Sequence, residues 1–120
     1  MRIFGERAPY RDRLALREDA LRRGVARITE ICATLADVRA AYVFGSHARG
    51  NVRLQSDLDI LVVRETEVRR AERDLDIRRA FDIGVGLDLI VVTPYEYAHV
   101  LPTTAFGQTI LTQCVAIYAA

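Results

Sequence analysis

The sequence contains no lysine, so all 17 of its basic residues are arginine. No lysine can therefore contact a triphosphate or act as a general base, and any cationic group that binds phosphate must be an arginine or a metal ion. The 17 basic residues are balanced by 16 acidic residues, which gives a formal net charge of +1. That balance gives no support to broad, non-specific binding of nucleic acid, and we expect no direct contact with it.

Long apolar runs are also absent. No stretch approaches the length of a membrane span, and the charged N-terminus lacks the hydrophobic core of a signal peptide, so we expect a cytoplasmic protein. The two cysteines, Cys32 and Cys114, lie far apart without the spacing of a metal site, which favours buried thiols. With 120 residues, of which 51% are hydrophobic, we expect a single globular domain, 1–120.

The first third of the chain predicts one long helix over residues 11–35, after a loosely held segment over 1–11. Apolar residues recur in this helix every three, four or seven positions and form a single stripe. Gly24 costs about 1 kcal/mol relative to alanine inside a helix, and its presence indicates a close packing contact. The stripe consists of Leu14, Leu21, Val25, Ile28, Cys32 and Leu35.

Three apolar runs of strand length, 40–44, 57–63 and 87–92, predict three strands. Between the last two of these, we expect a helix over 66–82 with Thr66 as its N-cap. The remaining elements are expected to be short helices over 94–100 and 104–113 and a closing strand over 115–118.

These elements predict an α+β fold with a mixed sheet of about four strands. We expect helices mainly on one face, with 11–35 and 66–82 as the covering layer and the functional site on a rim or an open face. In the helix over 66–82, charge pairs four residues apart are expected to join Glu65 to Arg69 and Asp74 to Arg78. Its arginines are interpreted as a solvated face, with a docking surface for an acidic partner as the alternative. They are Arg69, Arg70, Arg73, Arg78 and Arg79.

A glycine-serine turn and a pair of aspartates flank a turn-rich link between the first two predicted strands. Gly45 permits close approach to a ligand, and Ser46 is expected to N-cap a short helix whose free N–H groups can receive phosphate. Asp57 and Asp59 are two residues apart, so that their carboxylates point to the same face of a strand. Such a pair repels unless a cation lies between its members, and ligands that are all oxygen favour Mg²⁺ or Mn²⁺.

Asp88 interrupts the third apolar run. A carboxylate within a buried strand is costly unless it is paired or binds a metal ion. If this strand lies beside the second strand, Asp88 joins Asp57 and Asp59 on one face. The alternative is an edge position where Asp88 meets only water, and solvation is also the common role of an isolated pair of aspartates. Taken with the turn upstream, the pattern favours a shared site.

Gly45-Ser46, ten intervening residues and then Asp57-Leu58-Asp59 resemble the signature of the nucleotidyltransferase superfamily typified by DNA polymerase β. The longer run GSHARGNVRLQSDLDILVV is similar to the minimal nucleotidyltransferases that act as antitoxins, and the resemblance extends over nearly the whole chain. It implies the nucleotidyltransferase fold and a third acid on a later strand, which Asp88 matches. It also implies ATP as substrate and a helical HEPN-type ribonuclease toxin as partner, modified with AMP on a tyrosine.

Nucleotidyl transfer places the three acids in distinct roles. Asp57 and Asp59 are expected to bind the ion that accompanies the nucleotide and to bridge to a second ion. Asp88 is expected to bind that second ion and to take the proton of the acceptor hydroxyl. Two Mg²⁺ ions are therefore expected, with Mn²⁺ as a substitute.

The remaining motif residues are candidates for binding the triphosphate. Gly45 and Ser46 are expected to bind the β- and γ-phosphates. Arg49 or Arg53 could neutralise the triphosphate, and Arg49 could equally brace the loop or pair with an acid of the site. His47 lies inside the motif, but the chemistry does not require it, and we interpret it as an exposed loop residue.

Three functions remain open from the sequence. The first is the transfer of AMP to a hydroxyl of the partner protein. The second is a binding module that neutralises its partner by occlusion, without catalysis. The third is a transferase that acts on a small molecule such as an aminoglycoside, although members of that class usually carry an additional helical domain. A homo-oligomer also remains open.

Overall fold

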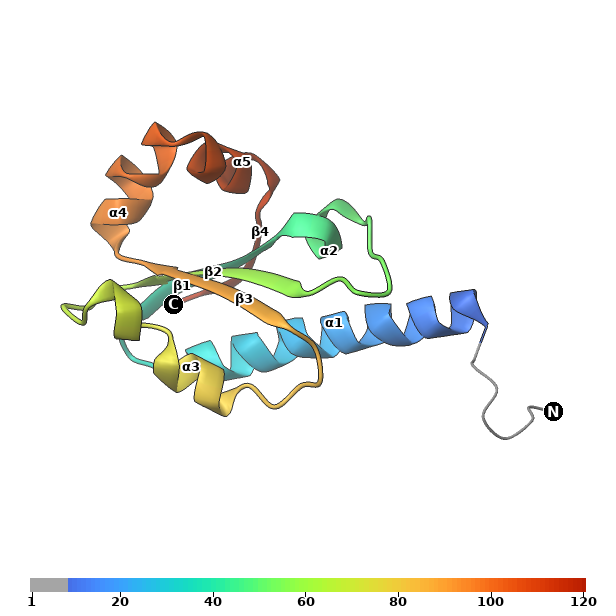
Figure 1. Cartoon of the computed structure of the whole chain (residues 1–120). Helices are drawn as coiled ribbons and strands as arrows, with labels where there is room; N and C mark the ends of the chain where they lie inside the picture. The colour runs from blue at the N-terminus through green and yellow to red at the C-terminus, as the bar shows by residue number, and fades with distance from the viewer. Residues whose placement is uncertain (1–8) are drawn as a thin grey trace.

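A four-stranded sheet forms the centre of the computed structural model, which describes residues 9–120 (Figure 1). Its strands are β1 (Val38–Phe44), β2 (Leu58–Arg64), β3 (Leu87–Val92) and β4 (Val115–Ala119). They lie in the order β3–β2–β1–β4, with β1 antiparallel to both of its neighbours and β3 parallel to β2. The predicted α+β fold with a mixed four-stranded sheet is confirmed.

Two helices, α1 (Tyr10–Ala33) and α3 (Leu75–Ala80), cover one face of the sheet (Figure 1). The predicted apolar stripe of α1 faces the strands, since Leu21, Ile28 and Cys32 are completely buried in the core on this side. The first turns of α1 extend beyond the edge of the sheet. Burial of these side chains is what fastens the long helix to the strands.

The C-terminal helices lie over the opposite face of the sheet (Figure 1). They are α4 (Pro94–His99), the 3₁₀ helix η2 (Leu101–Thr103) and α5 (Ala105–Gln113). The start of α4 is set by a capping box, in which Thr93 Oγ1 accepts from the Glu96 N–H and Glu96 Oε1 accepts from the Thr93 N–H. The sequence predicts these helices, but not that they form a second covering layer. The core between them and the sheet contains Phe44, Leu61, Val63, Val92 and Ile110.

The segment after β2 does not form the single helix that the sequence predicts over residues 66–82. It contains the 3₁₀ helix η1 (Arg70–Glu72) and, after a turn, the six residues of α3. Thr66 does not cap a helix; its Oγ1 accepts a hydrogen bond from the Val68 N–H at 3.1 Å, which closes a local turn. The prediction of a continuous helix is therefore wrong.

A buried arginine at the end of β2 accounts for this difference. Arg64 is only 9% exposed, and its guanidinium binds the carboxylates of Asp37 and Asp76. It also donates to the Arg73 carbonyl oxygen at 3.0 Å. In a continuous helix that carbonyl would accept from the Ile77 N–H, which donates to Asp76 Oδ1 instead. Because a buried guanidinium must satisfy its donors, its contacts prevail over the local preference for helix.

The charge pairs predicted for this segment are formed only in part. Asp74 and Arg78 form the predicted ion pair. Glu65 pairs with Arg39 of the neighbouring strand instead of Arg69, since without the helix the two predicted partners no longer lie one turn apart.

Arg73 is not part of a solvated face, contrary to the prediction. Its side chain is 12% exposed and donates to Glu96 Oε1 at 2.6 Å and to the Val68 carbonyl oxygen at 2.8 Å. Although burial opposes ionisation of Glu96, hydrogen bonds from the Thr93 N–H, Arg70 and Arg73 lower its pKa to about 2. These contacts tie α4 to the segment between β2 and α3.

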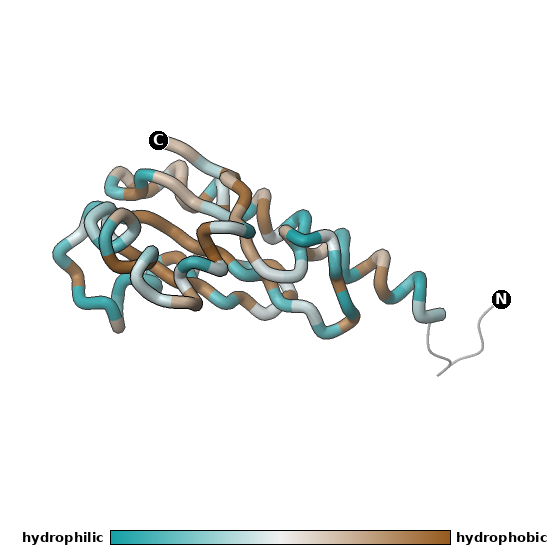
Figure 2. Tube along the Cα trace, turned by 90° about the horizontal axis from the view of Figure 1, so that it is seen from above, coloured by the Kyte–Doolittle hydropathy of each residue, from teal (hydrophilic) through white to brown (hydrophobic). Residues whose placement is uncertain are grey.

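Apolar residues are concentrated in the strands, whereas the exposed end of α1 is largely polar (Figure 2). None of the helices within residues 9–120 is both long and apolar enough to cross a membrane. The loosely held segment predicted over 1–11 lies almost entirely outside the described residues.

Two glycines inside helices test how tightly the two layers are packed. A Cβ on Gly24 would lie 2.8 Å from Leu58 Cδ2 and 3.4 Å from Phe81 Cζ, which confirms the predicted close contact. A Cβ on Gly107 would overlap the Leu101 carbonyl oxygen. We expect Gly24→Ala to destabilise the fold by about 1–3 kcal/mol, as overpacking does. Gly107→Ala should cost more, since backbone yields less than a side chain. Urea unfolding measures both, and a stabilised Gly107→Ala variant would contradict the packing.

Candidate active site

Two aspartates on neighbouring parallel strands form the centre of the site. Asp59 of β2 and Asp88 of β3 are directly paired in the register of the two strands. Because paired residues on adjacent strands project to the same face, their carboxylates meet, and a hydrogen bond joins them. Burial, that hydrogen bond and the charge of Asp88 raise the pKa of Asp59 to about 6. Two carboxylates in such contact share a proton unless a cation takes its place.

Gly45 makes room for this pair. Its φ is +71°, which glycine adopts without strain, and a Cβ there would overlap the Asp59 carboxylate. The short helix α2 (Gly45–Arg49) begins at this residue. The N-cap position is Phe44, without a side-chain hydrogen bond, so the prediction of Ser46 as N-cap is wrong: the helix starts one residue too early for Ser46 to precede it.

Asp57 lies just before β2, and its carboxylate is directed to a different neighbour. A Cβ on Gly86 would overlap this carboxylate, and the Leu58 N–H donates to the Gly86 carbonyl oxygen at 2.8 Å. Gly86 therefore leaves room for the Asp57 carboxylate, as Gly45 does for the Asp59 carboxylate. The sequence analysis did not predict this role of Gly86. The charge of Asp57 still reaches Asp59 and contributes to its raised pKa. The sequence around Gly86 gave no indication of this contact with Asp57, because the contact depends on how β3 approaches β2.

A cavity of about 570 Å³ opens beside the paired aspartates. Arg49 contributes to its wall, and the Arg49 Nη1 donates to Gln113 Oε1 at 3.1 Å. The positive charge of Arg49 favours ionisation of Asp59, against the raised pKa described above. Arg53 does not line this cavity. Among the predicted residues, the cavity contains Gly45, Ser46, Arg49, Asp59 and Asp88.

Arg78 is a second arginine of this cavity, and the sequence analysis placed it on a solvated face. It comes from α3 on the other side of the sheet. Its Nη1 donates to the Leu87 carbonyl oxygen at 2.9 Å, and its Nε is paired with Asp74. Arg78 therefore binds β3 immediately beside Asp88. The expected continuous helix over 66–82 did not indicate this position.

His47 is partly buried in α2, not exposed in a loop as predicted. Burial and the nearby positive charge of Arg22 lower its pKa, and Glu18 opposes this shift. His47 therefore faces the exposed half of α1 and does not line the cavity beside the aspartates.

The donors of this site suit a hard divalent cation. Asp59 and Asp88 supply oxygen atoms, the ligands that Mg²⁺ and Mn²⁺ prefer, and the raised pKa of Asp59 marks a position where a positive charge is favoured. Within residues 9–120, no three His, Cys, Asp or Glu side chains are already arranged around one point as metal ligands. Asp59 and Asp88 thus fit a metal ion as they stand, and Asp57 fits by donor type but faces Gly86.

A comparison of two glycines with the same backbone conformation distinguishes backbone strain from steric crowding at the site. Gly45 and Gly50 have φ values of +71° and +70°, but a Cβ on Gly50 meets nothing within 4 Å. We expect both Gly45→Ala and Gly50→Ala to lose about 1–2 kcal/mol of stability from the left-handed conformation. Only Gly45→Ala should also displace the Asp59 carboxylate and return its pKa toward the ordinary range. Carbon-13 NMR of the carboxyl groups distinguishes the two variants, and an unchanged Asp59 pKa in Gly45→Ala would contradict the steric account.

The raised pKa of Asp59 has a consequence for the pH dependence of stability. A carboxyl group whose pKa is raised on folding contributes stability below its unfolded pKa, and this contribution is lost as the pH rises through about 6, the pKa of Asp59. In Asp88→Asn the repelling charge is gone, so the Asp59 pKa should fall. We therefore expect Asp88→Asn to gain stability relative to the wild type between about pH 4 and pH 7. Urea unfolding across this range measures the gain in stability, and parallel pH profiles of the two proteins would contradict the effect of Asp88 on the pKa of Asp59.

Comparison with known proteins agrees with this geometry. Residues 26–111 match the family described as polymerase beta, nucleotidyltransferase. No curated protein matches the chain. A proposed nucleotidyltransferase from Sulfolobus solfataricus has a similar structure, with a TM-score of 0.62 and 22% identity over 98% of this chain and 93% of that one.

Two toxin-antitoxin complexes are also similar to the chain. A toxin-antitoxin structure with AMP-PNP gives a TM-score of 0.48 at 20% identity, over 86% of this chain and 73% of that one. A tri-AMPylated HEPN toxin with an MNT antitoxin from Shewanella oneidensis gives 0.46 at 17% identity, with the same coverage. Likeness at these identities concerns the fold alone. The family match, in contrast, includes the glycine-serine turn and all three aspartates, and the chain belongs to the polymerase beta nucleotidyltransferase family of enzymes.

Proposed function

We propose that the protein transfers AMP from ATP to a hydroxyl group of a partner protein, with divalent metal ions. The observation that carries the proposal is the contact of Asp59 with Asp88 beside the bend at Gly45. Family membership supports nucleotidyl transfer in general. The choice of ATP, of Mg²⁺ and of a protein acceptor follows from the resemblance of the motif to the minimal nucleotidyltransferases.

The reaction exchanges one phosphorus–oxygen bond for another. The acceptor hydroxyl oxygen forms a bond to the α-phosphorus, and the bond from that phosphorus to the oxygen that bridges to the β-phosphorus breaks. Pyrophosphate leaves with the bond electrons, and the hydroxyl proton passes to the carboxylate of Asp88. Negative charge grows on both the attacking and leaving oxygens, so the site must stabilise it from two sides.

The three aspartates would hold the metal ions that this charge distribution requires. Bound Mg²⁺ supplies the stabilisation of the attacking and leaving oxygens and lowers the pKa of the acceptor hydroxyl. Asp59 contacts Asp88 and is within reach of the charge of Asp57, so it would serve both ions. Asp57 must turn from its seat at Gly86 to join them.

The phosphates would lie along α2 on the opposite side of Asp59 from Asp88. Gly45 and Ser46 line the cavity there and would contact the β- and γ-phosphates. Arg49 is the arginine placed to neutralise the triphosphate, since it lines the same cavity and already acts on Asp59. Arg53 is the weaker candidate, because it lies outside the cavity wall. The chain has no lysine, so guanidinium and metal ions must supply all of the positive charge.

The proposed partner is a small helical HEPN-type ribonuclease, and a tyrosine is the proposed acceptor. A binding module without catalysis is the second candidate. The orientation of Asp57 toward Gly86 favours it, because within residues 9–120 no set of three acids is arranged to receive a metal ion. The two candidates differ in whether neutralisation of the partner depends on the carboxylates.

The double variant Asp57→Asn, Asp59→Asn separates these candidates. With ATP, Mg²⁺ and a small helical HEPN-type protein as the proposed partner, the wild type should add an AMP mass to that protein. Loss of two metal-binding carboxylates should reduce the transfer by about 100-fold or more. Asp19→Asn is the matched control, because it removes an exposed carboxylate that pairs only with Arg23 on the surface of α1.

Intact mass spectrometry measures the transfer, and calorimetry measures ATP binding with and without Mg²⁺. Loss of both Mg²⁺-dependent ATP binding and neutralisation in the double variant would support the transferase. Full neutralisation by the double variant would overturn it in favour of the binding module.

A further inference from the structure

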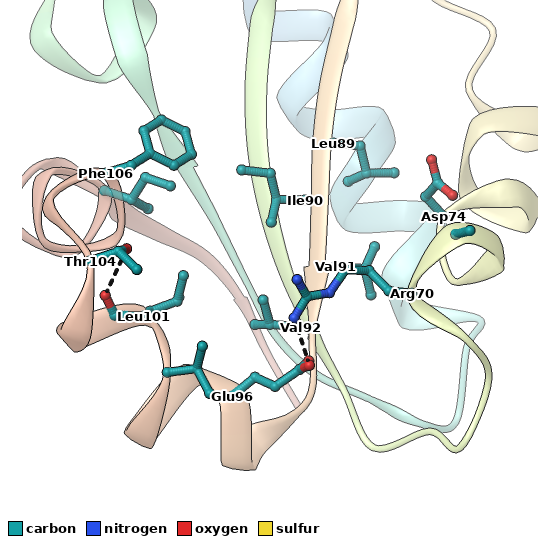
Figure 3. A pocket seen from close by; sticks show the side chains of 13 residues that line it. Arg70, Asp74, Leu89, Ile90, Val91, Val92, Glu96, Leu101, Thr104 and Phe106 are labelled. Atoms are coloured by element: carbon teal, nitrogen blue, oxygen red, sulfur yellow. Dashed lines mark hydrogen bonds and ion pairs between the residues drawn. The ribbon is translucent and has the colours of Figure 1, made fainter.

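A second cavity of about 440 Å³ adjoins the one that contains the aspartates. It lies along β3, the edge strand of the sheet, between the C-terminal helices and the segment that contains η1 (Figure 3). The two cavities share four wall residues and therefore lie side by side. These are Leu89, Ile90, Phe106 and Ile110.

The second cavity has an apolar wall and a polar margin. Ile90 is directed from β3 toward Phe106 of α5, and Leu101 lies on the same side (Figure 3). At the margin, Arg70 Nη2 is paired with Glu96 at 2.9 Å. Since the charged groups at the margin already bind one another, the interior offers mainly hydrophobic contact. A sugar, whose hydroxyl groups each need a partner, is poorly suited to such a wall.

Thr104 and Asp74, the other polar residues of the wall, are also engaged. Thr104 Oγ1 accepts from the Gly107 N–H at 2.9 Å, and Asp74 is paired with Arg78. The cavity thus selects for an apolar group of moderate size. Its volume is at the lower end of the range of about 300–1,000 Å³ that is typical of ligand pockets.

The position of the cavity agrees with the side from which the acceptor hydroxyl would approach in the proposed reaction. In-line displacement at phosphorus requires the attacking oxygen to enter opposite the leaving pyrophosphate. In our proposal the pyrophosphate lies near Gly45 and Ser46, at the end of β1. Crossing the sheet from β1 through β2 leads to Asp59 and then to Asp88 on β3. The apolar cavity begins at Leu89 and Ile90, the residues of the edge strand that follow Asp88, so an acceptor in it would reach Asp88 from the side away from β1.

We propose that this cavity is the acceptor subsite and that it takes an aromatic ring whose hydroxyl group points to Asp88. The inference rests on the proposed function and adds to it the residues of this chain that receive the acceptor. A phenol suits the site because its ring is apolar while its hydroxyl is at the far end. Phe106 is 63% exposed and stands at the junction of the two cavities, where its ring can pack against that of the acceptor.

N-acetyl-tyrosinamide is the probe that tests this subsite on the full chain, with glucose as the polyol comparison. In methyl NMR spectra, we expect the probe to shift the methyl signals of Ile90, Leu101 and Ile110, and glucose to leave them unchanged. Ala71→Trp should fill the cavity from η1, where Ala71 is exposed and lines the wall, and weaken probe binding by about tenfold or more. Ala98→Trp is the matched control, because Ala98 is an exposed residue of α4 outside the wall.

The same variants decide whether the cavity serves the reaction. With ATP and Mg²⁺, AMP transfer to the probe hydroxyl should fall in Ala71→Trp and stay unchanged in Ala98→Trp, while Mg²⁺-dependent ATP binding is equal in all three proteins. Absence of probe binding, binding that Ala71→Trp does not weaken, or absence of AMP transfer to the bound probe would each overturn the subsite. Failure of ATP binding in the wild type would instead refute the proposed function, so the two failures are distinguishable.

Discussion

The parallel pairing of β2 with β3 is the constraint on which the site depends. It sets Asp59 opposite Asp88, and burial together with the neighbouring carboxylate raises the pKa of Asp59 to about 6. A cation at this position would oppose this shift and gain two oxygen ligands at once. The pairing therefore creates an affinity for positive charge that neither strand has alone, and the bend at Gly45 leaves room for it.

Arginine side chains bind backbone carbonyl groups on either side of this pairing's connecting segment, and one of them reaches β3 itself. Arg64 donates to the carbonyl of Arg73, and Arg78 donates to that of Leu87. Each contact joins segments that local sequence does not bring together, and the second lies next to Asp88. A guanidinium group can bind a carboxylate and a carbonyl at the same time. Both Arg64 and Arg78 do so, in a chain that has no lysine.

Much of this site could be predicted from residue types, because its central pattern is local. The motif at Asp59 and the isolated acid at Asp88 indicated that these two carboxylates would meet, whereas the predicted convergence of Asp57 with them is not seen, because its carboxylate lies against Gly86. The failed helix over 66–82 shows the limit: its periodicity favoured helix, but the buried Arg64 at the end of β2 binds the Arg73 carbonyl oxygen, and the Ile77 N–H donates to Asp76. The role of Gly86 depends likewise on a contact between strands, so no pattern in the sequence could indicate it.

The two cavities offer two kinds of surface, which in our proposal meet different demands of nucleotidyl transfer. The first combines carboxylates with Arg49 and suits the negative charge that develops when a nucleotidyl group is transferred. The second is apolar and lies at the edge of the sheet. Phosphate chemistry alone would not need the apolar wall, and packing alone would have filled it with side chains. In our proposal the acceptor occupies this apolar space, which begins next to Asp88 at Leu89 and Ile90, and in-line attack brings its hydroxyl group from that side.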